Sequence, residues 1–333
     1  MRESPIVDLT MASSAFAIGI VVGLTGMGGG ALMTPVLVLF FNVPPLAAVS
    51  SDLVASAMMK PVGSAVHLRH QTVNLSLVKW LVIGSVPAAF CGVLVLKALG
   101  DDQSVQSNIQ TALGLALLLT ATLLVVRAYL RLVEKARNRD GRDQTRGGIP
   151  SSRTVPVRVS PRIVPTLLLG LVGGFIVGMT SVGSGSLIIV GLMLLYPGLK
   201  ANQLVGTDLV QAVPLVLAAA LGHYFFGDIS MSVTLPLIIG SIPGVFLGAQ
   251  LSSRLNGGLV RRALAFVLLA SGLKMLGLEN LTTGIILLAV LLVAPPLWMY
   301  MRTRLGFPAW HMKLPFRAAG NHPLTPKEGP DDD

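Results

Sequence analysis

The stretch VGLTGMGGGALMTP, residues 22–35, decides how this chain folds, because it puts five glycines into eight positions of an otherwise apolar segment. Each glycine weakens a helix by about 1 kcal/mol relative to alanine, so the stretch predicts a helix break. A second stretch, VGMTSVGSGSLIIV at residues 177–190, repeats its pattern. The sequence therefore predicts two breaks of the same kind in one chain.

The composition around these breaks is that of a membrane protein. Of the 333 residues, 53% are hydrophobic and only 12% are charged, and the mean hydropathy is +0.74. A soluble domain carries about 25% charged residues. Long apolar segments, as at 111–130, favour membrane-spanning helices over the short alternating strands of an outer-membrane barrel. We expect membrane lipid to surround most of the chain.

Agreement between the two halves extends well beyond the breaks. SSDLV at 50–54 matches GTDLV at 206–210, and IGSVP at 83–87 matches IGSIP at 239–243. The matching segments occur in the same order with a single change of register. This pattern predicts an internal duplication.

Each repeat is predicted to hold five helical elements. The expected elements are 6–24, 31–41, 51–68, 78–99 and 104–130 in the first repeat, and 164–179, 186–196, 207–226, 235–254 and 260–276 in the second. The second element of each repeat has about eleven residues, too few to cross a bilayer of about 30 Å. The first two elements therefore form a glycine-broken hairpin, either re-entrant or fully spanning.

The charged loops set the orientation. Segment 131–162 holds nine Lys or Arg against three Asp or Glu, which predicts a cytoplasmic linker. The basic residues lie in loop 69–79 of the first repeat, whereas the equivalent loop 225–235 carries one aspartate, and the bias after the fourth elements is reversed. Two repeats inserted in opposite directions explain this exchange. The N-terminus is then outside and the C-terminus cytoplasmic.

The predicted fold is an all-α polytopic membrane protein with two inverted repeats and a C-terminal transmembrane helix. Its parts are a first repeat at 6–130, a basic cytoplasmic linker at 131–162, a second repeat at 163–276, an extra helix at 282–301 and a cytoplasmic tail at 302–333. Much of the net charge of +10 lies in the linker, which argues against a nucleic-acid partner. A homo-oligomer is left open.

Enzyme chemistry finds little support in this sequence. Cys91 is the single cysteine, which excludes an internal disulfide and a cysteine-based metal site. We find no H-E-x-x-H motif, no nucleotide-binding P-loop and no serine with an assigned base. We expect no catalytic residues, no metal and no cofactor.

Paired breaks in inverted repeats are typical of secondary transporters, whose half-helix N-termini point at the substrate. Free backbone N–H groups and the positive end of the helix dipole favour an anion there, and close helix packing through small residues is the alternative. The candidate substrate-binding residues are Thr25, Gly26, Gly28, Gly29, Gly30 and Thr34 at the first break, and Thr180, Ser181, Gly183, Ser184, Gly185 and Ser186 at the second.

Two further candidates lie inside predicted spans. Lys60 falls near mid-membrane, where a positive charge suits an anionic substrate. The alternative is a lysine that reaches the interface from a shifted span. Gln211 is a polar group that contacts substrate or bonds a neighbouring helix.

Four titratable residues are candidates for ion coupling. Asp52 and Asp208 occupy equivalent positions at the predicted start of the third elements, where aspartate also serves as an ordinary helix cap. His67 and His223 lie at the far end of the same elements and can titrate near neutral pH. The alternative for both histidines is a position at the membrane interface.

At these residues the chain resembles the TauE/SafE family of sulfite exporters, also grouped as toluene-sulfonate uptake permeases. The resemblance rests on GLTGMGGGALMTP, SSDLVAS and IGSVPAAFCG and on their second copies, and it covers about 7–276. The second copy departs from the first, because Ser181 and Ser184 replace Gly26 and Gly29, and Val190 replaces Pro35. The two half-sites are therefore not equivalent.

The resemblance implies a bacterial or archaeal inner-membrane permease that moves a small sulfur-containing anion such as sulfite, sulfoacetate or an aryl sulfonate. Coupling to the proton gradient is usually supposed for the family. The alternatives are an anion channel, a permease for a carboxylate or for a metal cation held by Asp52 and Asp208, and a membrane enzyme or scaffold. The sequence sets neither the substrate nor the direction of transport.

Overall fold

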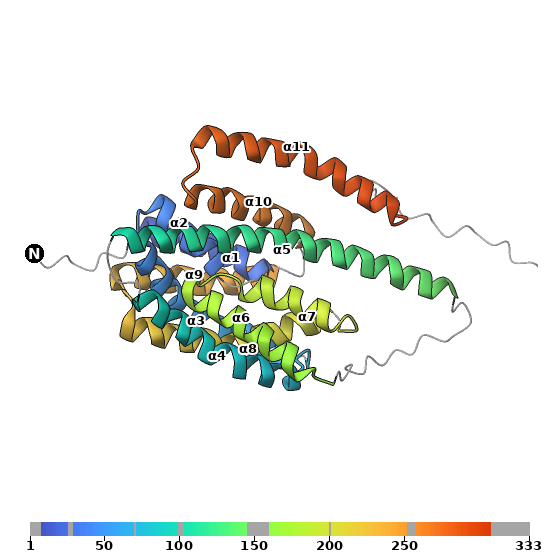
Figure 1. Ribbon diagram of the computed structural model, residues 1–333, viewed down its shortest axis with the longest axis horizontal. Helices are drawn as coiled ribbons and strands as arrows, with labels where there is room; N and C mark the ends of the chain where they lie inside the picture. Colours follow the sequence, from blue (N-terminus) through green and yellow to red (C-terminus); the bar gives the residue numbers. More distant parts are fainter. Residues whose placement is uncertain are drawn as a thin grey trace, which may run out of the picture.

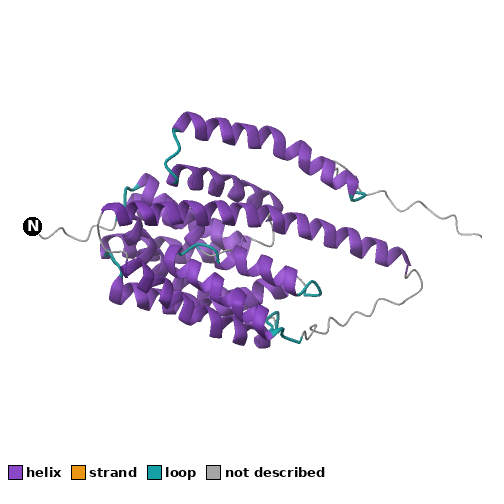
Figure 2. Ribbon diagram, viewed as in Figure 1, coloured by secondary structure: helices purple, strands orange, loops and turns teal. Residues whose placement is uncertain are grey.

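The computed structural model describes residues 8–25, 29–69, 71–98, 103–144, 160–199, 201–251 and 257–307. These residues form helices joined by short loops, and none of them lies in a strand (Figure 2). The helices are α1 (Leu9–Thr25), α2 (Gly30–Phe40), α3 (Pro45–Arg69), α4 (Leu75–Ala98), α5 (Gln103–Gln144), α6 (Ile163–Thr180), the short π-helix η1 (Ser184–Ile188), α7 (Ile189–Leu195), α8 (Ala201–Phe226), α9 (Met231–Leu251), α10 (Gly257–Met275) and α11 (Asn280–Arg304). The prediction of an all-α polytopic fold is confirmed.

Three predicted bounds differ from the observed ones by six residues or more. Helix α5 continues past residue 130 into the predicted linker, because the Arg, Lys and Glu residues there are good helix formers. Helix α3 begins six residues earlier than predicted, at Pro45, since proline suits the first helical position. Helix α8 likewise begins six residues early. The earlier starts of α3 and α8 place Asp52 and Asp208 inside these helices and not at their first residues.

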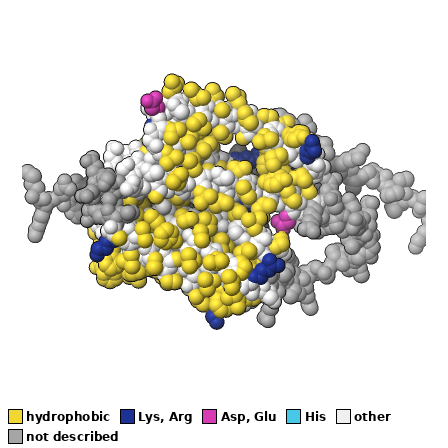
Figure 3. Space-filling model, in the orientation of Figure 1, with side chains coloured by type: hydrophobic (Ala, Val, Ile, Leu, Met, Phe, Trp, Pro, Cys, Tyr) yellow, Lys and Arg dark blue, Asp and Glu magenta, His cyan; other side chains and the backbone are white. Residues whose placement is uncertain are grey.

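Six helices in the described segments are long and apolar enough to cross a membrane. Hydrophobic side chains cover most of the face seen in Figure 3, which carries few charged groups. Helix α11 is the outermost element in Figure 1, and it buries only Thr283 and Arg302. Its apolar surface suits contact with lipid.

The two broken hairpins enter the bundle from opposite ends. In Figure 1, α1 begins and α2 ends at the left, whereas α6 begins and α7 ends at the right, where α5 continues towards the linker. Both helix breaks therefore lie in the interior of the bundle. The opposite insertion of the repeats in a membrane stays a prediction.

Helices of one half pack against helices of the other half in pairs that the repeat relates. Helix α1 packs against α9, and its counterpart α6 packs against α4. Helices α3 and α8 pair with each other, as do α5 and α10. Each half therefore interlocks with the other, and neither forms a separate bundle.

Glycines spaced four residues apart allow the closest of these contacts. On α9 the residues Gly240, Gly244 and Gly248 face backbone oxygens of α1, and on α6 the residues Gly170, Gly174 and Gly178 face backbone oxygens of α4. A Cβ atom at any of the six would overlap those oxygens. Small residues of this kind let membrane helices approach closely.

We predict that Gly248→Val lowers the melting temperature of the purified protein, whereas Gly284→Val leaves it nearly unchanged. A side chain at Gly248 meets the backbone of Ile20, but one at Gly284 enters open space. Overpacking of this kind costs typically about 1–3 kcal/mol. Both variants add the same side chain to a helix interior, so the difference isolates the packing. Equal melting temperatures would contradict the α1–α9 contact.

Candidate functional site

The two helix breaks touch each other in the middle of the bundle. Gly30, the first residue of α2, lies against the backbone oxygen of Ser181, where α6 ends. A Cβ atom on Gly30 would overlap that oxygen, so only glycine fits. This contact brings Gly30 of the first break together with Ser181 of the second.

The second break owes its shape to two residues with positive φ. Ser181 has φ of 58° and donates its backbone N–H to the oxygen of Val177 at 2.7 Å, which ends α6. Gly183 has φ of 116°, a conformation that side-chain-bearing residues rarely adopt. The chain then enters η1, a single π-helical turn of the kind that is frequent at functional sites.

Asp52 of α3 connects the two breaks. Its Oδ2 atom accepts hydrogen bonds from Ser181 Oγ at 2.5 Å and from Thr34 Oγ1 at 3.2 Å. The carboxyl group is fully buried, and Oδ1 has no hydrogen-bond partner among the described residues. Asp52 lies within the third turn of α3, so its interpretation as a helix cap is wrong.

Lys60, two turns further along α3, reaches the second break. Its Nζ donates to Ser184 Oγ at 3.0 Å, and only 7% of the side chain is exposed. The ammonium group interacts electrostatically with Asp52 and Asp208. The interpretation of Lys60 as a lysine that reaches the interface is therefore wrong.

Asp208 of α8 is a second buried carboxyl that interacts electrostatically with Lys60. Its Oδ1 atom accepts a hydrogen bond from Gln211 Nε2 at 3.1 Å, and Gln211 Oε1 accepts one from Ser85 Oγ of α4 at 3.4 Å. All three side chains are buried. Gln211 thus bonds a neighbouring helix and also holds Asp208. Asp208 also lies in the third turn of its helix, so its capping interpretation is wrong.

The sequence reasoning missed two residues of α5 that border the second break. Arg127, with 2% of its side chain exposed, has Nη1 at 3.5 Å from the backbone oxygen of Gly185. Thr120 Oγ1 lies 3.4 Å from Ser186 Oγ. A signal was present, because Arg127 is the first charge after Asp102 in a long apolar run.

Other predicted residues serve their own helices or lie outside the site. Thr25 and Thr180 donate their hydroxyls to backbone oxygens of α1 and α6 at 2.9 Å and 2.6 Å. Gly26 and Gly28 lie outside the described residues. His67 bonds Thr72 Oγ1 at 2.9 Å, in the loop after α3.

His223 lies between helices inside the bundle. It is fully buried, and its Nε2 is 2.9 Å from the oxygen of Gly178, near the end of α6. Its Nδ1 is 2.8 Å from Ser50 Oγ of α3. The imidazole therefore joins helices α3, α6 and α8 close to the second break.

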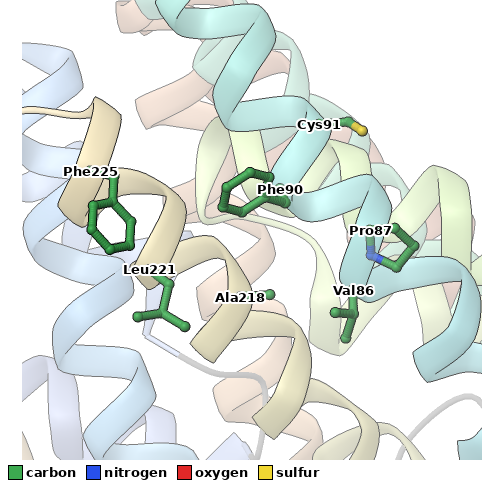
Figure 4. Close-up of a pocket in the computed structure, with 7 residues that line it drawn as sticks. All are labelled: Val86, Pro87, Phe90, Cys91, Ala218, Leu221 and Phe225. Atoms are coloured by element: carbon green, nitrogen blue, oxygen red, sulfur yellow. The ribbon is translucent and has the colours of Figure 1, made fainter.

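A surface hollow of about 470 Å³ lies elsewhere, between α4 and α8 (Figure 4). The side chains that line it are Val86, Pro87, Phe90, Cys91, Ala218, Leu221 and Phe225. They include no group that could hold a charge on an anion. The hollow suits an acyl chain of a lipid, and the charged site at the breaks is the better candidate for a solute.

The fold and this buried charged site define a polytopic membrane protein with broken helices. A family profile described as "Sulfite exporter TauE/SafE" matches residues 11–275. The chain therefore belongs to the TauE/SafE family, and it is a membrane transporter rather than an enzyme.

Relatives with similar sequences carry consistent names. The chain is 38% identical over 260 residues to the "Probable membrane transporter protein YjnA" of Bacillus subtilis, covering 78% of this chain and 96% of that protein. It is 23% identical over 266 residues to the "Probable membrane transporter protein YunE" of the same organism, covering 78% and 93%. No solved structure matches the chain.

We predict that Gly30→Ala destabilises the protein more than Gly29→Ala. The added methyl group at position 30 meets the backbone of Ser181, which cannot yield without moving the break. At position 29 it meets the flexible end of Met59 at 2.9 Å. Thermal unfolding in detergent measures both variants, and a larger loss for Gly29→Ala would contradict the contact between the breaks.

Proposed function

We propose that this transporter is a secondary-active permease that moves a small sulfur-containing anion across the inner membrane by alternating access, with proton coupling. Sulfite, sulfoacetate and other organosulfonates are the expected substrates. The observation that carries the proposal is the buried contact between Lys60 and Ser184 at the second break. In this proposal the N-terminus lies outside and the C-terminus in the cytoplasm.

The charges near the second break favour an anion. Lys60 and Arg127 approach it from two different helices, at Ser184 and Gly185. A sulfonate or sulfite group carries three oxygens that accept hydrogen bonds, and charge-assisted hydrogen bonds to such groups are about twice as strong as neutral ones. The hydroxyls of Ser184 and Ser186 complete a set of donors for these oxygens.

The balance of charge in the buried site supports proton coupling. The cations Lys60 and Arg127 face the carboxylates Asp52 and Asp208, which gives a neutral group of four. An added anion leaves a net negative charge in a medium where unpaired charge is very costly. A proton on Asp52 or Asp208 restores neutrality for a singly charged anion, and protons on both carboxyls restore it for a dianion such as sulfoacetate, so anion and protons bind together.

Asp52 also links the two hairpins in the proposed transport cycle. Its carboxylate accepts hydrogen bonds from hydroxyls of both breaks, at Thr34 and Ser181. A protonated Asp52 holds these hydroxyls less strongly, which leaves them available to substrate oxygens. Protonation thus also loosens the link between the two hairpins, and this allows one to move relative to the other.

Alternating access has a structural basis in the opposite entry of the hairpins, α1–α2 and α6–α7 (Figure 1). Motion of one hairpin opens the site towards one end of the bundle, and motion of the other opens it towards the opposite end. An anion channel would need no such exchange and would show no saturation. A cation permease is disfavoured by Lys60, which lies beside both aspartates.

We predict that Lys60→Met abolishes saturable uptake of radiolabelled sulfite or sulfoacetate into proteoliposomes, because the substrate loses its buried cationic partner. Ser184→Ala, which removes the hydroxyl but leaves the charge, raises KM about tenfold, the effect of one charge-assisted hydrogen bond. Lys79→Met on the exposed end of α4 is the matched control. Normal uptake by folded Lys60→Met would contradict the site.

We predict that Asp52→Asn and Asp208→Asn remove the dependence of uptake on a pH gradient, since an amide cannot carry the coupled proton. At least one of these two variants still exchanges labelled for unlabelled substrate when the pH is the same on both sides of the membrane. Asp228→Asn, in the exposed loop after α8, keeps the gradient dependence of the unaltered protein. Gradient-driven uptake by both site variants would refute coupling through these carboxyls.

A further inference from the structure

Three arginines gather beside the second break, on the side of it that faces the linker. Arg127 and Arg131 are four residues apart on α5 and so lie on one face of that helix, one turn apart. Arg261 lies near the start of α10, which packs against α5. Arg127 interacts electrostatically with both of the others, and Arg131 with Arg261.

The antiparallel register of α5 and α10 places Arg261 level with this pair. Gly114 and Gly272 face each other where the two helices cross, since each lies close to the other's backbone oxygen. Eleven residues along each helix from this crossing lead to Val125 on α5 and Arg261 on α10. Val125 is half a turn before Arg127, so the three guanidinium groups share one stretch of the helix interface.

The guanidinium groups are only partly satisfied within the described residues. Arg127 Nε and Nη2, Arg131 Nε and Arg261 Nε are buried atoms without a hydrogen-bond partner there. Three neighbouring cations repel one another, and burial makes this repulsion costly. Asp208 interacts electrostatically with Arg127 and Glu134 with Arg131, so the three arginines face two acids. Such a cluster fits an anion with several acceptor oxygens.

Two exposed arginines, Arg262 and Arg304, provide a comparison for this cluster. Arg262 packs its guanidinium over the ring of Trp298 at 5.1 Å, and Arg304 packs over Tyr300 at 5.1 Å. Both side chains are exposed. Arg127 is instead 98% buried, and Arg131 and Arg261 turn their Nε atoms inward. The cluster is therefore built differently from a set of charges that merely mark a membrane interface.

We propose that Arg127, Arg131 and Arg261 form a second oxyanion site, which shares Arg127 with the Lys60 site and lies at the predicted cytoplasmic mouth of the second break. Its ligand is a sulfur or phosphorus oxyanion group, whether of a free solute or of a lipid headgroup. With a free solute, the site concentrates the anion next to Gly185, which Arg127 also contacts. The proposal does not depend on transport through the Lys60 site, because it concerns equilibrium binding.

The test is the rise in melting temperature caused by sodium sulfate at constant ionic strength, because a ligand that binds the folded state stabilises it. It is measured on Lys60→Met protein, in which the central cation is absent. We expect the sulfate effect to persist in this background. Addition of Arg261→Gln or Arg131→Gln weakens the apparent sulfate affinity about tenfold, and addition of the adjacent Arg262→Gln leaves it unchanged.

Nanodiscs distinguish the two sources of the oxyanion. If the ligand is a free solute, sulfate raises the melting temperature equally in zwitterionic and in phosphatidylglycerol discs, and this rise depends on Arg261. A lipid headgroup instead gives an Arg261-dependent stabilisation by phosphatidylglycerol that suppresses the sulfate effect, and this result also supports the site.

Two results would overturn the proposal. One is loss of every oxyanion effect in Lys60→Met, which would place all anion binding at the central site. The other is an unchanged affinity for both sulfate and phosphatidylglycerol in the Arg261→Gln and Arg131→Gln variants.

Folding of the variants is checked by size-exclusion chromatography, and the two single replacements spare the deeply buried Arg127. Uptake by protein with intact Lys60 remains a separate measurement, so failure of this proposal and failure of the permease proposal are distinguishable.

Discussion

The contact between Gly30 and the backbone oxygen of Ser181 is the constraint on which the rest of the site depends. Because no side chain separates the two breaks there, Thr34 and Ser181 can share one carboxylate oxygen of Asp52. The same closeness brings Ser184 within reach of Lys60. Two glycine-broken hairpins that enter from opposite ends thus become one buried polar site in an apolar bundle.

Glycine has two different uses in this protein, and the sequence alone did not separate them. In the flanking helices, glycines spaced four residues apart let α9 lie against α1 and α6 against α4. At the breaks, Gly30 allows a close approach and Gly183 supplies a positive φ. Both functions follow from the missing Cβ atom, but only the second creates space for polar chemistry.

Much of the fold could be predicted from hydropathy, the repeat and proline or glycine positions, because these act locally. The starts of α3 and α8 were predicted six residues too late, although Pro45 is a residue that favours a helix start, and the error turned two buried aspartates into helix caps. Arg127 was missed because a charge near the end of a predicted span resembles an interface residue. Its burial depends on packing between α5 and the second break, which no local pattern reveals.

In the proposed mechanism, a sulfur-containing anion binds where the two breaks meet. The most direct measurement is anomalous diffraction from crystals soaked with selenate, a heavier analogue of a sulfur oxyanion. We predict a selenium peak within hydrogen-bonding distance of Lys60 Nζ and Ser184 Oγ, and its disappearance in Lys60→Met crystals. A peak confined to other positions, or none near Lys60 at concentrations that saturate binding, would contradict it.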